Sequence, residues 1–99
     1  MQYGGTVYMM TNLTHQVIYV GVTADLISRV QEHKFGIFQK SFTARYNCKK
    51  LIYYYSFPTI EEAISEEKRI KGGSRKKKEH LIESINPGWR DLWEDIKHW

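Results

Sequence analysis

Residues 6–22, with the sequence TVYMMTNLTHQVIYVGV, decide the fold of this chain. The two ends of the stretch, 6–11 and 17–22, are rich in β-branched, aromatic and other apolar residues, which predicts two strands. The residues between them, 12–16, are polar and few. Because so short a connection joins neighbouring antiparallel strands, we expect a β-hairpin.

Side chains in a strand alternate between two faces, and this sorts the residues of the hairpin. Val20 and Val22 share the face that should meet the core. Tyr8 and Tyr19 are then expected to stand together on the opposite, non-core face. Gly21 lies beside them and has no side chain, so another group can approach the backbone closely there. The alternative is that tyrosines are simply common in strands.

The remaining elements follow from caps, breakers and apolar periodicity. We expect a helix from Thr23 to about Lys34 and a strand at 51–57. Two further helices should run from the Thr59–Glu62 capping box to Gly72 and from the cap Ser74 to about Ile85. A last helix should begin at Asn86-Pro87 and bury the apolar residues Trp89, Leu92, Trp93 and Ile96. Residues 37–50 show no period and should form a loop region. The order ββαβααα predicts a small α/β fold with a three-stranded antiparallel or mixed sheet flanked by helices.

Composition limits the class of protein. With 99 residues the chain should form one domain, with a core over about 3–85 and the C-terminal helix over about 87–97. The single cysteine excludes an internal disulfide and favours a reducing, cytoplasmic location, and no apolar run is long enough for a membrane span. Seven of the fifteen Lys and Arg fall between Lys68 and Lys78, which suits nucleic acid or a merely solvated basic helix.

The first predicted helix carries Arg29 and His33, which are four residues apart and therefore share a helical face. An arginine and a histidine together can hold a phosphate, and the histidine can also exchange a proton. The alternative is an ordinary solvated helix face.

The second predicted helix places a carboxylate on its apolar side. Its buried stripe should consist of Ile60, Ala63, Ile64 and Ile70, and Glu67 continues that stripe. An unpaired carboxylate facing the interior is costly, so Glu67 is a candidate metal ligand. The alternatives are that Glu67 lies at the edge of the stripe and reaches solvent, or that it pairs with Arg29.

Cleavage of a phosphodiester needs a base or water-orienting group, a cation and a hard metal ion. Magnesium is typically held by one or two carboxylates, with waters and substrate phosphate as its other ligands. The candidates for these parts are Tyr8, Tyr19, Arg29, His33 and Glu67.

The order of these residues resembles the GIY-YIG nuclease superfamily. The two motif triads correspond to Thr6-Val7-Tyr8 and Tyr19-Val20-Gly21, with ten residues between the tyrosines. The stretches DLISRVQEHKFG (25–36) and EEAISEEKRIKGGSRKKKEHLIESINPGWRDLW (61–93) are similar to the small stand-alone endonuclease branch of the superfamily, which is related to the catalytic domains of a repair excinuclease and of homing endonucleases. Threonine replaces the glycine of the first triad, and valine replaces the isoleucine of the second.

This resemblance implies a role for each candidate residue. Tyr8 would orient or deprotonate the attacking water, and Tyr19 would assist through a hydrogen bond. Arg29 would stabilise charge on the scissile phosphate, while His33 would position or activate the tyrosine and the water. Glu67 would be the sole protein ligand of one Mg²⁺ or Mn²⁺ ion. Because the pKa of tyrosine is ordinarily about 10, Arg29 and the metal would have to favour the phenolate.

The resemblance also implies the partner, which is DNA, and the activity, which is endonuclease cleavage in repair or recombination. Single-stranded, branched and damaged DNA all remain open as substrates, and a homodimer or a protein partner could supply specificity. The phosphate-binding candidates in the basic segment are Lys71, Arg75, Lys76 and Lys77. Asn86 could belong to the site or could simply cap a helix.

Two other functions fit the same sequence. The first is a module of the same fold that binds nucleic acid but cleaves it weakly or not at all. The second is a protein-interaction adaptor whose last helix presents Trp89, Trp93 and Trp99 as a docking surface.

Overall fold

A three-stranded antiparallel sheet lies at the centre of the computed structural model, which describes residues 4–36 and 45–99. Strand β1 (Gly5–Thr11) lies between β2 (Ile18–Thr23) and β3 (Lys50–Phe57). β1 pairs with both neighbours in antiparallel register, so the predicted hairpin and the predicted third strand are confirmed. Most of the predicted loop region lies outside the described residues.

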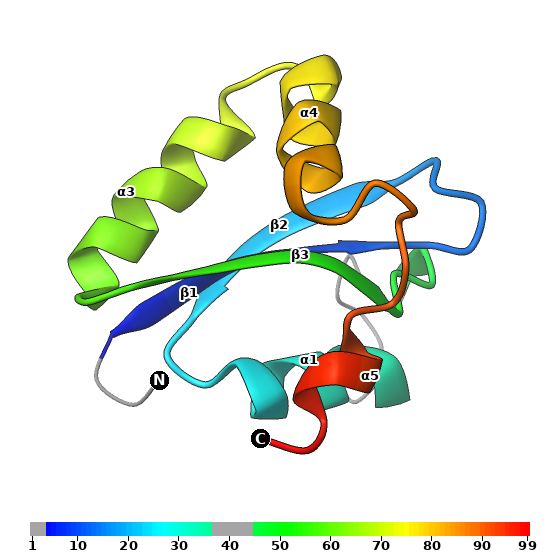
Figure 1. The fold of residues 1–99 in the computed structure, drawn as a ribbon, viewed down its shortest axis with the longest axis horizontal. Coiled ribbons are helices and arrows are strands. Elements are labelled where there is room, and N and C mark those ends of the chain that lie inside the picture. Colours follow the sequence, from blue (N-terminus) through cyan, green and yellow to red (C-terminus); the bar gives the residue numbers. More distant parts are fainter. Residues whose placement is uncertain (1–3, 37–44) are drawn as a thin grey trace.

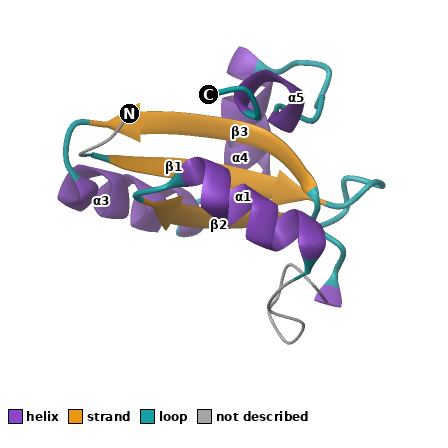
Figure 2. Ribbon diagram, turned by 90° about the horizontal axis from the view of Figure 1, so that it is seen from below, coloured by secondary structure: helices purple, strands orange, loops and turns teal. Residues whose placement is uncertain are grey.

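Helices cover the sheet from both sides. Helices α3 (Ile60–Lys71) and α4 (Arg75–Ile85) lie on one face, and α1 (Leu26–Phe35) and the short α5 (Trp93–Ile96) lie on the other (Figures 1 and 2). The element order matches the predicted ββαβααα. Within the described residues, no helix combines the length and the apolar content that crossing a membrane requires.

Side-chain caps fix where the helices begin. Thr59 and Ser74 accept hydrogen bonds from backbone amides of α3 and α4, as predicted. At α1 the predicted cap Thr23 is wrong, because Asp25 accepts the amide of Ser28 at 3.2 Å. Thr23 instead accepts the amide of Asp25 itself at 3.0 Å, so it shapes the turn that leads into the helix.

Both faces of the sheet are buried, and this corrects one expectation. Val7 and Met9 pack into the cluster beneath α3 and α4. Tyr8 and Met10 pack into a second cluster with residues of α1 and α5. The face that carries Tyr8 is therefore not an open, non-core face, and Tyr8 is only 1% exposed.

The predicted last helix is also wrong over most of its length. From Asn86-Pro87 the chain runs without helix until α5, and Trp89 adopts a left-handed φ of 53°. Trp89 packs with the α3 and α4 cluster, whereas Leu92 and Ile96 pack with the opposite cluster. The segment therefore crosses from one face of the sheet to the other, which no single helical face could do.

Asn86 and Leu92 hold this crossing segment against the outer edge of β3. Asn86 is buried, and its Nδ2 donates to Ile52 O at 3.0 Å and to Arg90 O at 2.9 Å. Leu92 N donates to Leu51 O at 2.7 Å. Both the donor and the acceptor of the Asn86 amide are thus used within the fold, because Asn86 Oδ1 also accepts a hydrogen bond from Arg90 N at 3.0 Å.

Candidate active site

The ring of Tyr8 lies across Gly21, its partner in the neighbouring strand. A Cβ atom at Gly21 would come within 2.5 Å of Tyr8 Cζ and Tyr8 Oη. The prediction that Gly21 admits a close neighbour is confirmed, and that neighbour is Tyr8. Since β2 is an edge strand, the glycine lets the tyrosine reach across β2 from the centre of the sheet.

Helix α1 brings His33 against this tyrosine. Leu26 and Val30 bury one side of α1 on the sheet, and His33 lies one further turn along the same side. Tyr8 Oη and His33 Nε2 are 2.8 Å apart and share a hydrogen bond. The ring of Tyr19 completes a three-ring cluster, with its centroid 6.2 Å from that of Tyr8 and 5.5 Å from that of His33.

Burial sets the protonation of the Tyr8–His33 pair. It raises the pKa of Tyr8 above its ordinary value, and the nearby Tyr19 raises this pKa further. Arg29 lowers the pKa of Tyr8, as a phenolate would require, but the effect of burial is larger. Burial also lowers the pKa of His33, and Arg29 lowers it further. At neutral pH Tyr8 therefore keeps its proton and His33 is uncharged.

Arg29 lies at the margin of this cluster and is partly neutralised there. Its Nε is 3.4 Å from Glu32 Oε1, and 46% of the Arg29 side chain is exposed. Glu32 Oε1 is buried and, within the described part of the chain, accepts no hydrogen bond. Sequence reasoning missed Glu32, although its i, i+3 spacing from Arg29 was a usable signal. Arg29 thus pairs with Glu32, not with Glu67.

Thr6, which stands where the motif has glycine, fits the sheet without disturbing it. It is 1% exposed, and its Oγ1 is 3.0 Å from Ser56 Oγ on β3. Its backbone keeps regular register with Thr23 and Ser56. The lost glycine therefore leaves the strand pairing next to Tyr8 intact.

Glu67 lies on α3, on the opposite face of the sheet from α1 (Figure 1). Ala63 and Ile70 are buried as predicted, but Ile64 is 37% exposed, which corrects that part of the stripe. The Glu67 side chain is 12% exposed, and its Oε2 is 2.8 Å from Lys71 Nζ. The structure thus brings together four of the predicted site residues on β1, β2 and α1, and places the fifth on α3.

The four predicted phosphate-binding residues have different surroundings. Lys71 pairs with Glu67. Arg75 is engaged by Glu79 at 2.8 Å and donates to two backbone carbonyls of the β1–β2 turn. Lys76 and Lys77 are exposed, and no ion pair involves either side chain within the described residues. They are therefore the two lysines of this set that are available to a partner.

The fold and the cluster together define a class of protein: a small three-stranded domain in which two strand tyrosines meet a histidine and an arginine of the following helix. Residues 4–80 match the model of the GIY-YIG catalytic domain. The chain belongs to the GIY-YIG family, for which nuclease-type activity is the expected chemistry.

Its relatives are small proteins of the UPF0213 group. The chain is 38% identical to the UPF0213 protein of Bacillus pumilus over 68 residues, which is 69% of this chain and 68% of the relative. It is 36% identical to UPF0213 protein HQ_3675A of Haloquadratum walsbyi over 66 residues, 67% of this chain and 73% of the relative. The solution NMR structure of UPF0213 protein BH0048 from Bacillus halodurans superposes with a TM-score of 0.55 at 28% identity, covering 89% of this chain and 92% of that one. The predicted α/β fold and family are thereby confirmed.

Proposed function

We propose that this protein is a divalent-metal-dependent endonuclease that hydrolyses DNA phosphodiester bonds during repair or recombination. The observation that carries the proposal is the 2.8 Å hydrogen bond between Tyr8 Oη and His33 Nε2, placed beside a partly exposed Arg29. A proton acceptor and a cation next to each other are what attack by water on a phosphate requires.

His33 is the base in this proposal and Tyr8 passes the proton. In the proposed resting state the neutral His33 carries its proton on Nδ1, so that the protonated phenol of Tyr8 donates to Nε2. The attacking water gives a proton to Tyr8 Oη while Tyr8 passes its own proton to His33 Nε2. This route needs no resting phenolate, which the buried position of Tyr8 disfavours.

Arg29 would stabilise the charge of the scissile phosphate. Its guanidinium is only loosely held by Glu32 at 3.4 Å, which is too long for a good hydrogen bond. Two oxygens of a phosphate could each accept one of two parallel N–H bonds from the same guanidinium at shorter distance. Arg29 can therefore turn from Glu32 to the substrate without breaking a strong contact.

Glu67 would hold the metal ion. The described residues contain no group of three or more His, Cys, Asp and Glu that could enclose a metal. One carboxylate nevertheless fits Mg²⁺ or Mn²⁺, because such ions keep several waters and take substrate phosphate as a further ligand. When bound, the ion supplies Lewis-acid stabilisation of the phosphate. To bind the ion, the Glu67 carboxylate would give up its ion pair with Lys71.

Strand β2 links the two parts of this proposed site. Tyr8 crosses Gly21 on β2 from one face, and α3, which carries Glu67, packs against β2 from the other. Since β2 is an edge strand, a phosphate near that edge is the position that both parts could serve.

The test is cleavage of single-stranded, nicked, branched and duplex DNA with Mg²⁺, Mn²⁺ or EDTA. Tyr8→Phe removes the relayed proton and should lower kcat by about 10²–10⁴-fold, the range for a lost general acid–base group. Tyr54→Phe is the matched control, because Tyr54 faces Tyr8 across the β1–β3 pair. Wild-type kcat in Tyr8→Phe would remove Tyr8 from the mechanism.

Glu67→Gln tests the metal ligand in the same assay. It should abolish metal-dependent cleavage while DNA binding in EDTA persists. Glu61→Gln, an exposed carboxylate on the same helix, should cleave as the wild type does. Equal activity in the two variants would move the metal away from Glu67.

One observation favours the alternative of a nucleic-acid-binding module that cleaves weakly. Tyr8 is 1% exposed, so water reaches its hydroxyl only after the groups that cover it move. Salt-sensitive DNA binding by the wild type, with no cutting on any substrate or metal, would establish that alternative.

A further inference from the structure

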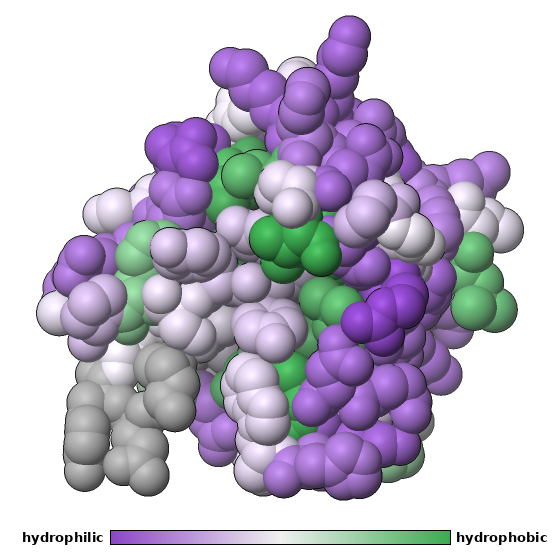
Figure 3. Space-filling model, in the orientation of Figure 1, coloured by the Kyte–Doolittle hydropathy of each residue, from purple (hydrophilic) through white to green (hydrophobic). Residues whose placement is uncertain are grey.

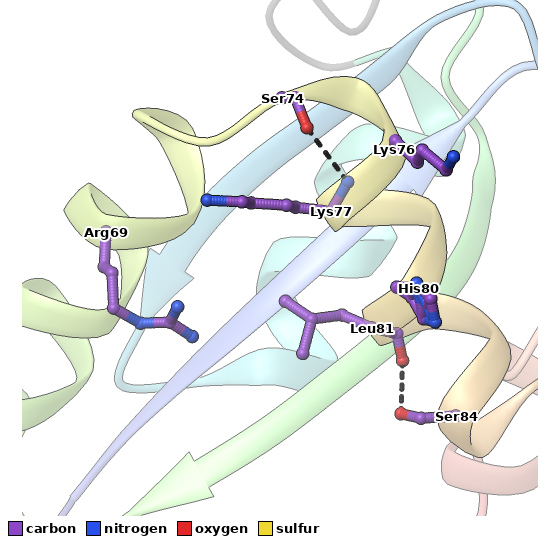
Figure 4. Close-up of a pocket in the computed structure, with 7 residues that line it drawn as sticks. All are labelled: Arg69, Ser74, Lys76, Lys77, His80, Leu81 and Ser84. Atoms are coloured by element: carbon purple, nitrogen blue, oxygen red, sulfur yellow. Dashed lines mark hydrogen bonds between the residues drawn. The ribbon is translucent and has the colours of Figure 1, made fainter.

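A groove between α3 and α4 lies on the face of the sheet away from the Tyr8–His33 pair. The part of the groove beside α4 is a cavity of about 570 Å³ between the two helices. Figure 4 shows Arg69 of α3 and Lys77 and Leu81 of α4 pointing into the space between the helices, while Lys76 lines the rim of the cavity from the outer side of α4. We call this feature, together with the hollow described next, the α3–α4 groove.

A second hollow of about 320 Å³ lies beside the first, over β3. Tyr53, Tyr55 and Phe57 of β3 line this part, and Leu81 lines both parts, so the two hollows adjoin at this side chain. Figure 3 shows apolar side chains exposed between the hydrophilic side chains of α3 and α4. One end of the α3–α4 groove is thus basic and the other is aromatic.

The charge of the groove is positive. Glu66 is the one carboxylate among its described lining residues, and it accepts two hydrogen bonds from Arg69 at 2.8 and 2.5 Å. These two charges neutralise each other. Lys76 and Lys77 remain, with no ion pair in the described part of the chain. A ligand of the groove should therefore carry negative charge at the α4 end.

The aromatic end offers a ring face to solvent. Tyr55 is 55% exposed, whereas Tyr53 is 5% exposed and forms the floor. The rings of Tyr55 and Phe57 lie with centroids 5.1 Å apart and an interplanar angle of 51°, so Phe57 supports the exposed ring. Exposed rings next to a basic surface are the features with which proteins bind unpaired nucleotides.

We propose that the α3–α4 groove holds an unpaired segment of DNA, with one phosphate against Lys77 between the helices, another against Lys76 at the rim where the strand passes over α4, and a base stacked on Tyr55. Bases in a duplex have both faces covered by their neighbours, so only an unpaired base can stack on the ring. The choice of DNA as the ligand rests on the proposed function. Among the DNA substrates that the sequence left undecided, this inference selects those with a single-stranded arm.

Binding of fluorescein-labelled oligothymidine in EDTA tests this inference without cleavage. Tyr55→Ala should weaken binding by about tenfold, and Tyr55→Phe should restore it, because stacking needs only the ring. Tyr46→Ala is the matched control, since Tyr46 is 43% exposed but lies outside the groove. Binding of an all-duplex DNA should not change in Tyr55→Ala.

The lysines are tested by charge removal in the same assay. Lys76→Gln/Lys77→Gln should reduce the slope of log K against log salt by about 1.4, because each phosphate contact with single-stranded DNA contributes about 0.7 to the slope. Lys49→Gln/Lys97→Gln removes equal charge elsewhere and should leave the slope unchanged. Displacement of oligothymidine by polyglutamate at equal charge would overturn the assignment, because a peptide cannot supply stacked bases.

The outcomes separate this inference from the proposed function. Metal-dependent cleavage that is lost in Tyr8→Phe, with unchanged oligothymidine binding in Tyr55→Ala, would overturn the groove and keep the nuclease. Tyr55-dependent binding without cleavage by the wild type would keep the groove and overturn the nuclease. Thermal melts of Tyr55→Ala and Tyr55→Phe show that both variants are folded when they are compared.

Discussion

At the scale of single residues, the tyrosine of the first motif and the glycine of the second explain each other. The Tyr8 ring occupies the space that a Gly21 side chain would need, and in this position Tyr8 Oη is 2.8 Å from His33 Nε2. The glycine of the second motif, Gly21, is therefore required by Tyr8 of the neighbouring strand. Sequence alone predicted a close approach at Gly21, but not which group approaches.

Gly21→Ala should destabilise the protein by about 1–3 kcal/mol, the usual cost of forcing extra volume into a packed region. The added Cβ meets Tyr8 at 2.5 Å, and Tyr8 cannot turn away without losing His33. Urea unfolding would measure the loss. Gly88→Ala is the control, because a Cβ at Gly88 meets nothing within 4 Å. Equal stability of the two variants would mean that the ring has room to move.

Glu32→Gln should shift the acidic limb of the pH–rate profile to lower pH. Burial and Arg29 lower the pKa of His33, while the Glu32 carboxylate raises it. Removing that charge lowers the pKa of His33 further, so the imidazole stays neutral and able to accept a proton in more acidic solution. Measuring kcat against pH for both proteins would show the shift. A limb that moves to higher pH would contradict the role of His33 as base.

At the scale of elements, Arg75 joins helix α4 to the hairpin. Its guanidinium donates to the carbonyls of His15 and Gln16, and its Nε donates to Glu79. Arg75 is thus one of the contacts that set the position of α4 over the sheet. Its place within a run of four basic residues concealed this role, because the run looks uniform in sequence.

Arg75→Ala should cost about 1–2 kcal/mol of stability, in line with hydrogen bonds from a partly exposed charged group. It should leave the salt dependence of DNA binding near that of the wild type. Urea unfolding and binding titrations over a range of salt would measure the two effects. A fall in the salt slope as large as that of the Lys76 and Lys77 variant would show that Arg75 contacts phosphate instead.

Local elements were predictable and the paths that connect them were less so. The hairpin and the caps at Thr59 and Ser74 depend on residues a few positions apart, so the sequence contains the necessary information. Trp89 and Leu92 follow a helical spacing, yet they pack on opposite faces of the sheet because the outer edge of β3 lies between them. Such a choice is made by contacts with residues far away in the sequence.

At the scale of the whole molecule, two layers of helices enclose the sheet, and this decides the chemistry of buried groups. The residues of the candidate site were selected from motif and spacing, but their protonation follows from burial that only the assembled fold supplies. Tyr8 is the clearest case. The alternation of side chains along the strand predicted the face of the sheet on which Tyr8 lies, but it could not predict that α1 and α5 cover that face.

Cys48 should report opening of the whole molecule. Its side chain is fully buried, and burial raises the pKa of the thiol to about 11. Because only the thiolate reacts, we expect a disulfide reagent at neutral pH to modify the native protein slowly and the unfolded protein at once. Cys48→Ala/Ser65→Cys places a thiol on the exposed side of α3 as the control. Equally fast reaction of native Cys48 and of that variant would mean that the core opens readily.

The crossing of residues 86–92 around β3 has a consequence for aggregation. Residues 51–57, LIYYYSF, carry no charge and have high β-propensity, the composition of segments that add strands to one another. Leu92 and Asn86 occupy the carbonyls of Leu51 and Ile52, so another chain cannot pair there. The C-terminal segment thus protects the sheet from its own copies, and a chain cut before Asn86 should self-associate through this edge.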